Sequence, residues 1–328
     1  MAHPCEGGEP ASEPAGQPMA VLRDRFQAGD LVLFLGAGVS LSAGLPGWES
    51  LLHRLTVEMW AQRLGAGAGG EDAEEFARLF RHAFGGFPII SGRYIRKALG
   101  HAFQERVRAI LYSHPEATSS LLKAVTRLCV SPEDGAGIRA VVCYNYDDLL
   151  EIHLAQRRVR FCSVSTEGQS PPPQVLPIYH VHGFLPRDGS LDHQSEIVFA
   201  EDAYHTQFLD PYAWSNITQL NLLRERTGLF VGFSMTDPNL RRLLDVANRY
   251  RHGRPHYVIM RTPSREQIAS GDTSQVSDER LEDFTRAYRS VQEDALAELG
   301  LQVVWVDRFD EIPCLLDRVR QSAPDGTP

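Results

Sequence analysis

The chain has 328 residues, of which 43% are hydrophobic and 23% charged; 33 Lys and Arg stand against 42 Asp and Glu, a formal net charge of −9 at pH 7. This composition excludes the fibrous and disordered classes and is typical of a globular protein with one large domain or two modest ones. The acidic balance argues against a protein whose main task is to neutralise nucleic-acid phosphates, so we expect no direct nucleic-acid binding.

The cysteines are dispersed along the chain, at Cys5, Cys129, Cys143, Cys162 and Cys314. They form no C-x-x-C pair and no Cys/His cluster at zinc-ligand spacing, so we expect free thiols in a reducing compartment and no metal. No apolar stretch approaches the roughly 20 residues that cross a bilayer, and the N-terminus lacks the regions of a signal peptide. We therefore expect a cytoplasmic protein without a membrane partner.

The first predicted elements are a tail, a short helix and a strand. Residues 1–19 hold four prolines, three glycines and three glutamates with almost nothing to bury, which predicts a disordered tail. A short helix is predicted at Val21–Phe26 and stops at Gly29. Leu31–Leu35 is an apolar run of strand length that ends in glycine. Because both faces of such a strand must be covered, it is typical of a central parallel strand in an α/β sheet.

Helical periodicity replaces this pattern over about residues 49–130. Amphipathic segments are predicted at Leu51–Met59, Phe76–Phe84, Tyr94–Leu111 and Leu121–Leu128, with a glycine-rich loop between the first two. We interpret this region as a helical module inserted into a sheet domain that spans residues 20–328.

Strand character returns after the module and alternates with helical stretches. The predicted strands are Ile138–Tyr144, Pro177–Val181, Leu229–Phe233, His256–Arg261 and Leu301–Val306, the last belonging to a C-terminal strand and helix at about 300–322. The polar segment Ser264–Glu279 is predicted as a loop. Strands interleaved with helices indicate βαβ units, and hence a Rossmann-like, doubly wound parallel α/β sheet.

Four strand-end stretches carry candidate chemistry, and the first is Gly36-Ala37-Gly38-Val39-Ser40 with Gly44-Leu45-Pro46 after it. A glycine turn lets backbone N–H groups approach a phosphate without Cβ interference, and the following helix adds a favourable dipole. The dinucleotide fingerprint is incomplete, because Leu41 stands where its third glycine belongs, and no Walker lysine is present. A tight structural turn is the alternative interpretation.

The second stretch is Tyr144-Asn145-Tyr146-Asp147-Asp148, at the end of the strand Ile138–Tyr144. Ligand sites in open α/β sheets gather at the carboxyl ends of strands. An Asn there offers an amide donor and a carbonyl acceptor without charge. In the alternative interpretation, Asn145 or Asp147 caps the next helix.

The third stretch is Tyr179-His180-Val181-His182-Gly183, also at a strand end. Alternation along a strand puts His180 and His182 on one face and Val181 on the other. The residue beside Gly183 at the rim is best placed to meet a ligand. His182 is therefore the candidate, and His180 is interpreted as a core histidine whose hydrogen bonds are satisfied internally.

The fourth stretch runs from Gly232-Phe233-Ser234 to Asp237-Pro238. Gly232 and Ser234 suit contact with a nucleotide ribose or phosphate, whereas Asp237 and Pro238 form an ordinary helix start. A plain strand-to-helix turn is the alternative. The basic helix that follows, Arg241–Arg254, is interpreted as a solvated face, with a partner or nucleotide contact as the alternative.

In this order, the four stretches resemble the SIR2-like superfamily of NAD-consuming proteins. The loop from Gly36 to Pro46 is similar to the family's phosphate loop, Asn145-Tyr146-Asp147 to its Asn-x-Asp motif, and His182-Gly183 to its His-Gly pair. Gly232-Phe233-Ser234 is similar to its Gly-x-Ser nucleotide contact. The likeness extends over about residues 21–244.

The resemblance implies a site for NAD as substrate, without a metal. Asn145 would hold the attacking water and the nicotinamide ribose, His182 would be the general base, and Asp147 would bind the nicotinamide carboxamide. The remaining implied contacts are Gly36, Ala37, Gly38 and Ser40 for the diphosphate, and Gly232 and Ser234 for the adenosine ribose.

Two departures separate the chain from the sirtuin deacylases. It has no zinc ribbon of two C-x-x-C pairs, and Gly47-Trp48-Glu49 stands where those enzymes carry a Phe-Arg pair. What remains resembles the SIR2-like NAD+ hydrolases of bacterial antiphage systems. That resemblance implies release of nicotinamide and ADP-ribose, a homo-oligomer, and action with a partner ATPase of the HerA-like type or another defence sensor. Two alternatives stay open: a catalytically silent nucleotide-binding scaffold that forms filaments or docks a partner ATPase, and an NAD-dependent protein deacylase.

Overall fold

The structure is a computed structural model that describes residues 16–65, 70–84, 88–113, 117–130, 136–189, 197–250, 253–268 and 276–321. Its centre is a seven-stranded sheet in which every neighbouring pair is parallel. In spatial order the strands are β3 (Phe161–Val164), β4 (Leu176–His180), β2 (Ile138–Cys143), β1 (Leu31–Leu35), β5 (Thr227–Val231), β6 (His256–Arg261) and β7 (Leu301–Val306). The predicted Rossmann-like, doubly wound α/β fold is confirmed.

Strand β1 lies at the point where the winding direction of the sheet reverses. The chain proceeds from β1 to β2 and β3 and then inserts β4 between those two strands, all on one side of β1; it returns to β5, β6 and β7 on the other side. In open α/β sheets, ligands bind in the crevice beyond the carboxyl ends of the strands at such a reversal. The carboxyl ends of β1, β2 and β5 are therefore the place to look for a site.

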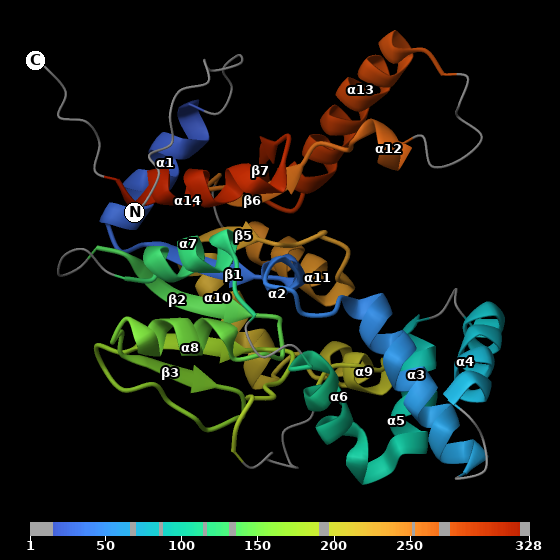
Figure 1. Cartoon of the computed structure of the whole chain (residues 1–328). Helices are drawn as coiled ribbons and strands as arrows, with labels where there is room; N and C mark the ends of the chain where they lie inside the picture. The colour runs from blue at the N-terminus through green and yellow to red at the C-terminus, as the bar shows by residue number, and fades with distance from the viewer. Residues whose placement is uncertain are drawn as a thin grey trace, which may run out of the picture.

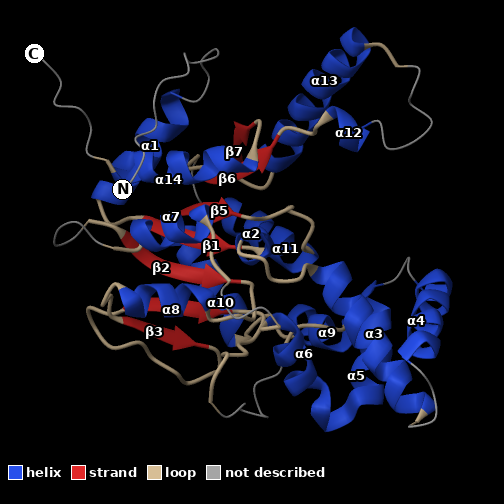
Figure 2. Cartoon of the chain, in the orientation of Figure 1, coloured by secondary structure: helices blue, strands red, loops and turns tan. Residues whose placement is uncertain are grey.

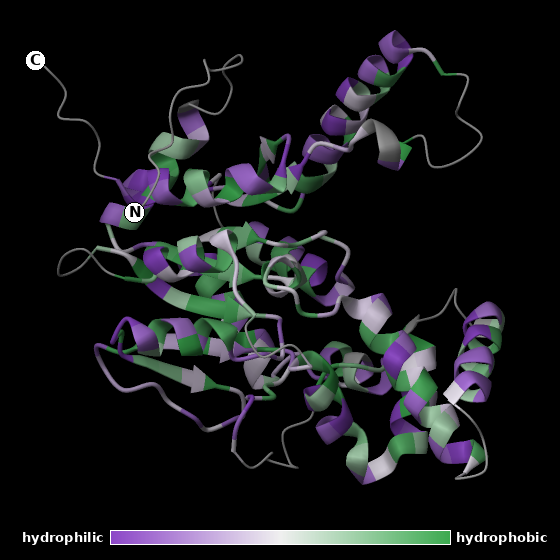
Figure 3. Cartoon of the chain, viewed as in Figure 1, coloured by the Kyte–Doolittle hydropathy of each residue, from purple (hydrophilic) through white to green (hydrophobic). Residues whose placement is uncertain are grey.

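Alternation along β1 explains why both faces of the sheet are covered. Leu31, Leu33 and Leu35 belong to one hydrophobic core, whereas Val32 and Phe34 belong to a second core on the opposite face. Figure 2 shows the strands between helical layers, and Figure 3 shows the hydrophobic colouring concentrated in the central strands. The continuous apolar run of the β1 sequence is the signature of this double coverage.

Different helices complete the two cores. The first core takes side chains from α1 (Gly16–Gln27), α7 (Ser120–Leu128), α8 (Leu149–Gln156) and α14 (Ile312–Arg320). The second takes side chains from α10 (Trp214–Glu225), α11 (Pro238–Asn248) and α13 (Asp278–Ala297). Helix α7, although part of the predicted 49–130 module, packs against α8 and α14.

The other helices of the 49–130 region gather beside the carboxyl edge of the sheet (Figure 1). They are α3 (Trp48–Leu64), α4 (Gly70–Phe84), α5 (Pro88–Leu99), the 3-10 turn η1 (Gly100–Ala102) and α6 (Phe103–Leu111). A later helix, α9 (Glu201–Leu209), joins this group through ion pairs of Arg93 with Glu201 and of Arg96 with Asp202. The short helices α2 (Ala37–Ser42) and α12 (Arg265–Ile268) and the turn η2 (Phe309–Glu311) complete the described elements.

Several predicted boundaries differ from the structure. Helix α1 begins at Gly16, inside the predicted 1–19 tail, because Met19 is buried in the first core; residues 1–15 lie outside the described residues. The predicted helix Tyr94–Leu111 is interrupted where Gly100 adopts a φ of +56°, which ends α5.

The predicted loop Ser264–Glu279 contains helix α12 and the first turn of α13, which Ser277 caps by accepting a hydrogen bond from Arg280 N; residues 269–275 lie outside the described residues. Strand β3 was not predicted, because it is a short edge strand of partly exposed residues and lacks an apolar run. None of the helices within the described ranges combines the length and the hydropathy that a bilayer crossing requires.

Candidate active site

A cavity of about 400 Å³ opens at the carboxyl ends of β1, β2 and β5. All the predicted site residues except Gly38 line it: Gly36, Ala37, Ser40, Asn145, Asp147, His182, Gly232 and Ser234. Its wall also includes Trp48 and Leu51 of α3, and Ile89 of α5, so the helical group closes one side of the cavity. The sheet therefore brings segments more than a hundred residues apart in the sequence to one hollow.

The glycines of the β1–α2 loop allow it to lie directly against the β5–α11 loop. The amide of Gly36 donates to the carbonyl of Val231 and that of Gly38 to the carbonyl of Gly232, both at 2.9 Å. A Cβ atom on Gly36 would lie 2.6 Å from the Gly232 oxygen, and one on Gly38 would lie 2.8 Å from the Gly232 Cα. The two amides are thus bonded to the last residue of β5 and to the first residue of the loop after it, and the glycines are required by this close approach.

Asn145 sits just beyond β2, and both its side chain and its backbone carbonyl are hydrogen-bonded; the Cys143 thiol donates to that carbonyl at 3.7 Å. The side-chain Nδ2 of Asn145 donates to the carbonyl of Gly36 at 3.1 Å, and its backbone carbonyl lies 3.2 Å from Nδ1 of His180. The first bond links the end of β2 to the end of β1, beside the glycine loop. The position of Asn145 beside the cavity is therefore fixed by hydrogen bonds to the ends of both strands that neighbour β2, namely β1 and β4.

Asp147 lies just before α8, next to its N-cap residue Asp148, and its two carboxyl oxygens have different partners. Its Oδ1 accepts a 3.2 Å hydrogen bond from the amide of Leu149 at the start of α8, and its Oδ2 accepts a 2.6 Å hydrogen bond from the hydroxyl of Ser40. The side chain is buried yet lines the cavity. Burial raises the pKa of the Asp147 carboxyl, although the hydrogen bonds from Ser40 and Leu149 oppose that shift. The buried Asp147 carboxyl therefore borders the cavity and can form hydrogen bonds there.

His182 lies beyond the end of β4, and its side chain is almost fully enclosed. Its ring centroid is 4.4 Å from that of Tyr144, and its Nε2 is 4.0 Å from Oδ2 of Asp237. The His182 carbonyl accepts a 2.8 Å hydrogen bond from the amide of Val198, which fixes the backbone. Burial lowers the pKa of His182, and the Asp237 carboxylate partly offsets this effect. A neutral imidazole is therefore favoured near pH 7, and such a ring can accept a proton.

His180 has a different environment, as predicted for a core histidine. It is fully buried, its Nε2 lies 2.6 Å from Oε1 of Glu151, and it does not line the cavity. Burial favours the neutral ring, but the Glu151 carboxylate outweighs that effect and holds the pKa of His180 well above its ordinary value. The pKa values of His180 and His182, only two residues apart, are thus shifted in opposite directions.

The β5–α11 loop supplies the remaining wall. Gly232 has a φ of +77° and Met235 a φ of +60°, so the loop turns twice through the left-handed region. The hydroxyl of Ser234 lies 2.7 Å from that of Thr236. Asp237 caps α11, because its Oδ1 accepts a 2.7 Å hydrogen bond from the amide of Leu240. Sequence reasoning identified this cap but missed that the other carboxylate oxygen faces His182.

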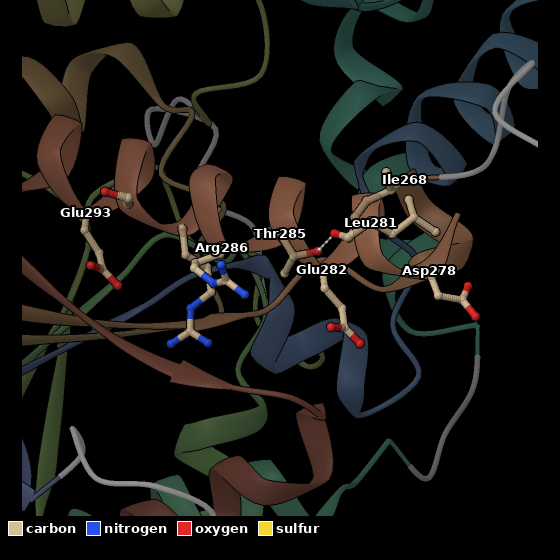
Figure 4. A pocket seen from close by; sticks show the side chains of 9 residues that line it. Ile268, Asp278, Leu281, Glu282, Thr285, Arg286 and Glu293 are labelled. Atoms are coloured by element: carbon tan, nitrogen blue, oxygen red, sulfur yellow. Dashed lines mark hydrogen bonds between the residues drawn. The ribbon is translucent and has the colours of Figure 1, made fainter. Parts of the chain in front are cut away.

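Another hollow, of about 770 Å³, lies between α12 and α13 (Figure 4). It is lined by Leu281, Arg286, Glu293 and neighbours on those helices, and none of the predicted site residues borders it. Within the described ranges, no group of three or more His, Cys, Asp or Glu side chains is arranged to hold a metal ion. The predicted chemistry is therefore concentrated at the carboxyl edge of the sheet.

Comparison with known proteins agrees with this arrangement. Residues 139–289 match the family model described as SIR2-like domain, and the chain contains such a domain. It is similar to the NAD(+) hydrolase ThsA of Enterococcus faecium, with 28% identity over 305 residues, and to the NAD(+) hydrolase ThsA of Bacillus cereus strain MSX-D12, with 25% identity over 306 residues. The alignments cover 91% and 90% of this chain, but only 56% and 55% of those proteins. The chain thus spans about half the length of these curated relatives.

Proposed function

We propose that the chain is an NAD+ hydrolase that cleaves the bond between nicotinamide and ribose and releases nicotinamide and ADP-ribose. The observation that carries the proposal is that Asn145 and His182, which follow different strands, line one cavity. Residues of the loops after β1 and β5, the candidates for nucleotide contacts, line the same cavity. The similarity to two NAD(+) hydrolases supports the choice of NAD over other nucleotides.

The chemistry requires little acid catalysis. The nicotinamide of NAD+ is cationic and leaves as a neutral base, so the site must orient the N-ribosidic bond, stabilise positive charge on the ribose and place a water molecule. In our proposal, the Asn145 side chain holds the water and the nicotinamide ribose. Water forms the new bond to the anomeric carbon as the bond to nicotinamide breaks, and neutral His182 accepts the proton. General-base assistance of this kind is typically worth about 10²–10⁴-fold.

The remaining contacts follow from the walls of the cavity. We propose that Asp147 binds the nicotinamide carboxamide, and that Gly232 and Ser234 lie near the adenosine ribose. The diphosphate would rest on the loop of Gly36, Ala37, Gly38 and Ser40. Because the amides of Gly36 and Gly38 are already bonded to Val231 and Gly232, the contribution of these two glycines is the shape of the loop on which the diphosphate would rest.

The biological setting is proposed from the family resemblance alone. We propose NAD depletion in a cytoplasmic antiphage system, by a homo-oligomer that acts with a partner ATPase of the HerA-like type or another defence sensor. Measuring particle size with and without NAD tests the oligomer, and co-purification with a candidate ATPase tests the partner.

The enzymatic proposal is tested by incubating the purified chain with NAD and measuring nicotinamide and ADP-ribose. Asn145→Ala and His182→Ala should each lower the rate by about 100-fold or more while the melting temperature stays near that of the unchanged protein. His101→Ala, which alters an exposed histidine, is the matched control and should retain full activity. Full nicotinamide release by the Asn145 or His182 variant would refute the assignment. NAD binding without release would favour the scaffold alternative, and release only with an acylated peptide would favour the deacylase.

A further inference from the structure

Behind the wall of the cavity lies a buried ionic pair that the proposed reaction does not use. His180 is the last residue of β4 and lies in register with Cys143, the last residue of β2. Glu151 stands in the first turn of α8, and its side chain is only 8% exposed. Burying two ionisable groups is costly unless each finds good partners, so such a pair calls for an explanation.

The bonds of His180 define its protonation state. One ring nitrogen, Nε2, lies 2.6 Å from a carboxylate oxygen of Glu151, and the other, Nδ1, lies 3.2 Å from the carbonyl oxygen of Asn145. A carboxylate and a backbone carbonyl can only accept hydrogen bonds, so the ring donates from both nitrogens and is an imidazolium. The negative charge of Glu151 balances it, and the Cys143 thiol is a further neighbour of the ring.

Glu151 is itself fixed from the edge of the sheet. Its Oε1 also accepts a 2.9 Å hydrogen bond from the hydroxyl of Ser163 on β3. A continuous chain of hydrogen bonds thus runs from Ser163 through Glu151 and His180 to the peptide of Asn145. It crosses β3, α8, β4 and the end of β2, which are rigid elements of the fold.

These hydrogen bonds reach Asn145 at its backbone carbonyl, whereas a separate hydrogen bond holds its side chain. The Asn145 carbonyl accepts from His180, while Nδ2 of the same residue donates to the carbonyl of Gly36 at 3.1 Å. Together the two contacts restrict both the backbone and the side-chain rotamer of Asn145. We infer that Glu151 and His180 are positioning residues, which fix the peptide of Asn145 and thereby orient its amide toward the substrate ribose.

This inference rests on the proposed function, and two substitutions of one residue separate it from a purely structural role. The amide nitrogen of an Asn at position 180 would occupy the place of Nδ1, and that of a Gln would occupy the place of Nε2. His180→Asn therefore keeps a donor to the Asn145 carbonyl and loses the contact with Glu151. His180→Gln keeps the contact with Glu151 and loses the donor to Asn145.

We expect activity and stability to move in opposite directions. His180→Gln should lower kcat by about tenfold or more with KM changed less than about threefold, because bound NAD meets a misplaced amide. His180→Asn should restore most of that turnover. It should nevertheless melt at a lower temperature than His180→Gln, because the buried carboxylate of Glu151 has lost the donor at position 180 and keeps only the hydroxyl of Ser163. A purely structural pair predicts that turnover follows melting temperature, and this result would overturn the inference.

A readout that needs no catalysis completes the test. The side-chain amide resonance of Asn145 can be assigned by its loss in Asn145→Ala. It should shift in His180→Gln and stay in place in His180→Asn; an unmoved resonance in His180→Gln would overturn the inference. If the unchanged protein releases no nicotinamide, the proposed function fails, and this resonance alone decides whether the pair positions Asn145.

Discussion

The hydroxyl of Ser40 donates a 2.6 Å hydrogen bond to Oδ2 of Asp147, so side chains 107 residues apart form one buried stretch of the cavity wall. The bond joins the helix after β1 to the segment after β2. Each residue also has a local role, since Ser40 belongs to the short helix α2 and Asp147 accepts a hydrogen bond at the start of α8. Their contact joins the two segments into one part of the cavity wall.

This contact leads to a prediction for Asp147→Asn. Burial raises the pKa of the Asp147 carboxyl, so its protonated form favours the folded state, and that contribution is lost as the pH rises through the folded-state pKa. An amide has no such charge and can still bond to Ser40 and Leu149. The variant should therefore melt above the unchanged protein at pH 7, while NAD turnover falls by about tenfold or more.

Thermal unfolding at pH 7 and at about pH 4, close to the ordinary Asp pKa, checks this prediction. The gain from Asp147→Asn should shrink at the lower pH, because a larger fraction of the raised-pKa carboxyl is then protonated in the folded protein. Asp188→Asn, which alters an exposed side chain, is the control and should show no such gain. A variant less stable than the unchanged protein at pH 7 would contradict the assigned effect of burial.

The dependence of kcat/KM on pH should show how Asp237 changes the pKa of His182. His182 must be neutral to accept a proton, so kcat/KM falls as the pH drops through its pKa, which burial places below the ordinary value of about 6.5. The Asp237 carboxylate raises that pKa. Asp237→Asn should therefore lower it further and move the acid limb of the profile to lower pH.

Asp237→Asn is a clean probe because Asn is as good a helix cap as Asp. The melting temperature should change little, since the bond to the Leu240 amide can persist. The measurement is kcat/KM for nicotinamide release between about pH 4.5 and 8, a range centred near the ordinary His pKa. A limb that moves to higher pH, or does not move, would show that Asp237 does not act on His182 in the proposed reaction.

The contact between the two glycine loops should be intolerant of a methyl group. Gly38→Ala would place Cβ 2.8 Å from the Cα of Gly232, and both partners are backbone, so the loops must separate. We expect a loss of about 1–3 kcal/mol in the free energy of unfolding, together with weaker NAD binding.

Gly70→Ala, at the start of α4, is the matched control because a Cβ there meets nothing within 4 Å. Its free energy of unfolding should stay within about 0.5 kcal/mol of the unchanged value. Chemical denaturation and NAD titration of both variants check the prediction. Normal stability and binding in Gly38→Ala would mean that the close approach of the loops is dispensable.

Much of the fold could be predicted because its signals are local. The strands β1, β6 and β7 are predicted residue for residue, and in β1 the reason is that a strand covered on both faces needs an unbroken apolar sequence. Strand β3 and helix α9 lack such a signal: the first is a partly exposed edge strand, and the second joins the other helices of its group through ion pairs at Arg93 and Arg96. Contacts of that kind leave no periodic pattern.

By itself, the sequence determined that Asn145, Asp147, His182 and the glycine loops lie at strand ends, because parallel strands all present their carboxyl ends at one edge. Only the tertiary structure decided what each group touches. It set one histidine beside Glu151 and the other beside Asp237, although the rings are two residues apart. It also committed the amides of Gly36 and Gly38 to the carbonyls of Val231 and Gly232, at the end of β5. Burial and electrostatic pairing depend on segments distant in the sequence, and no local pattern encodes them.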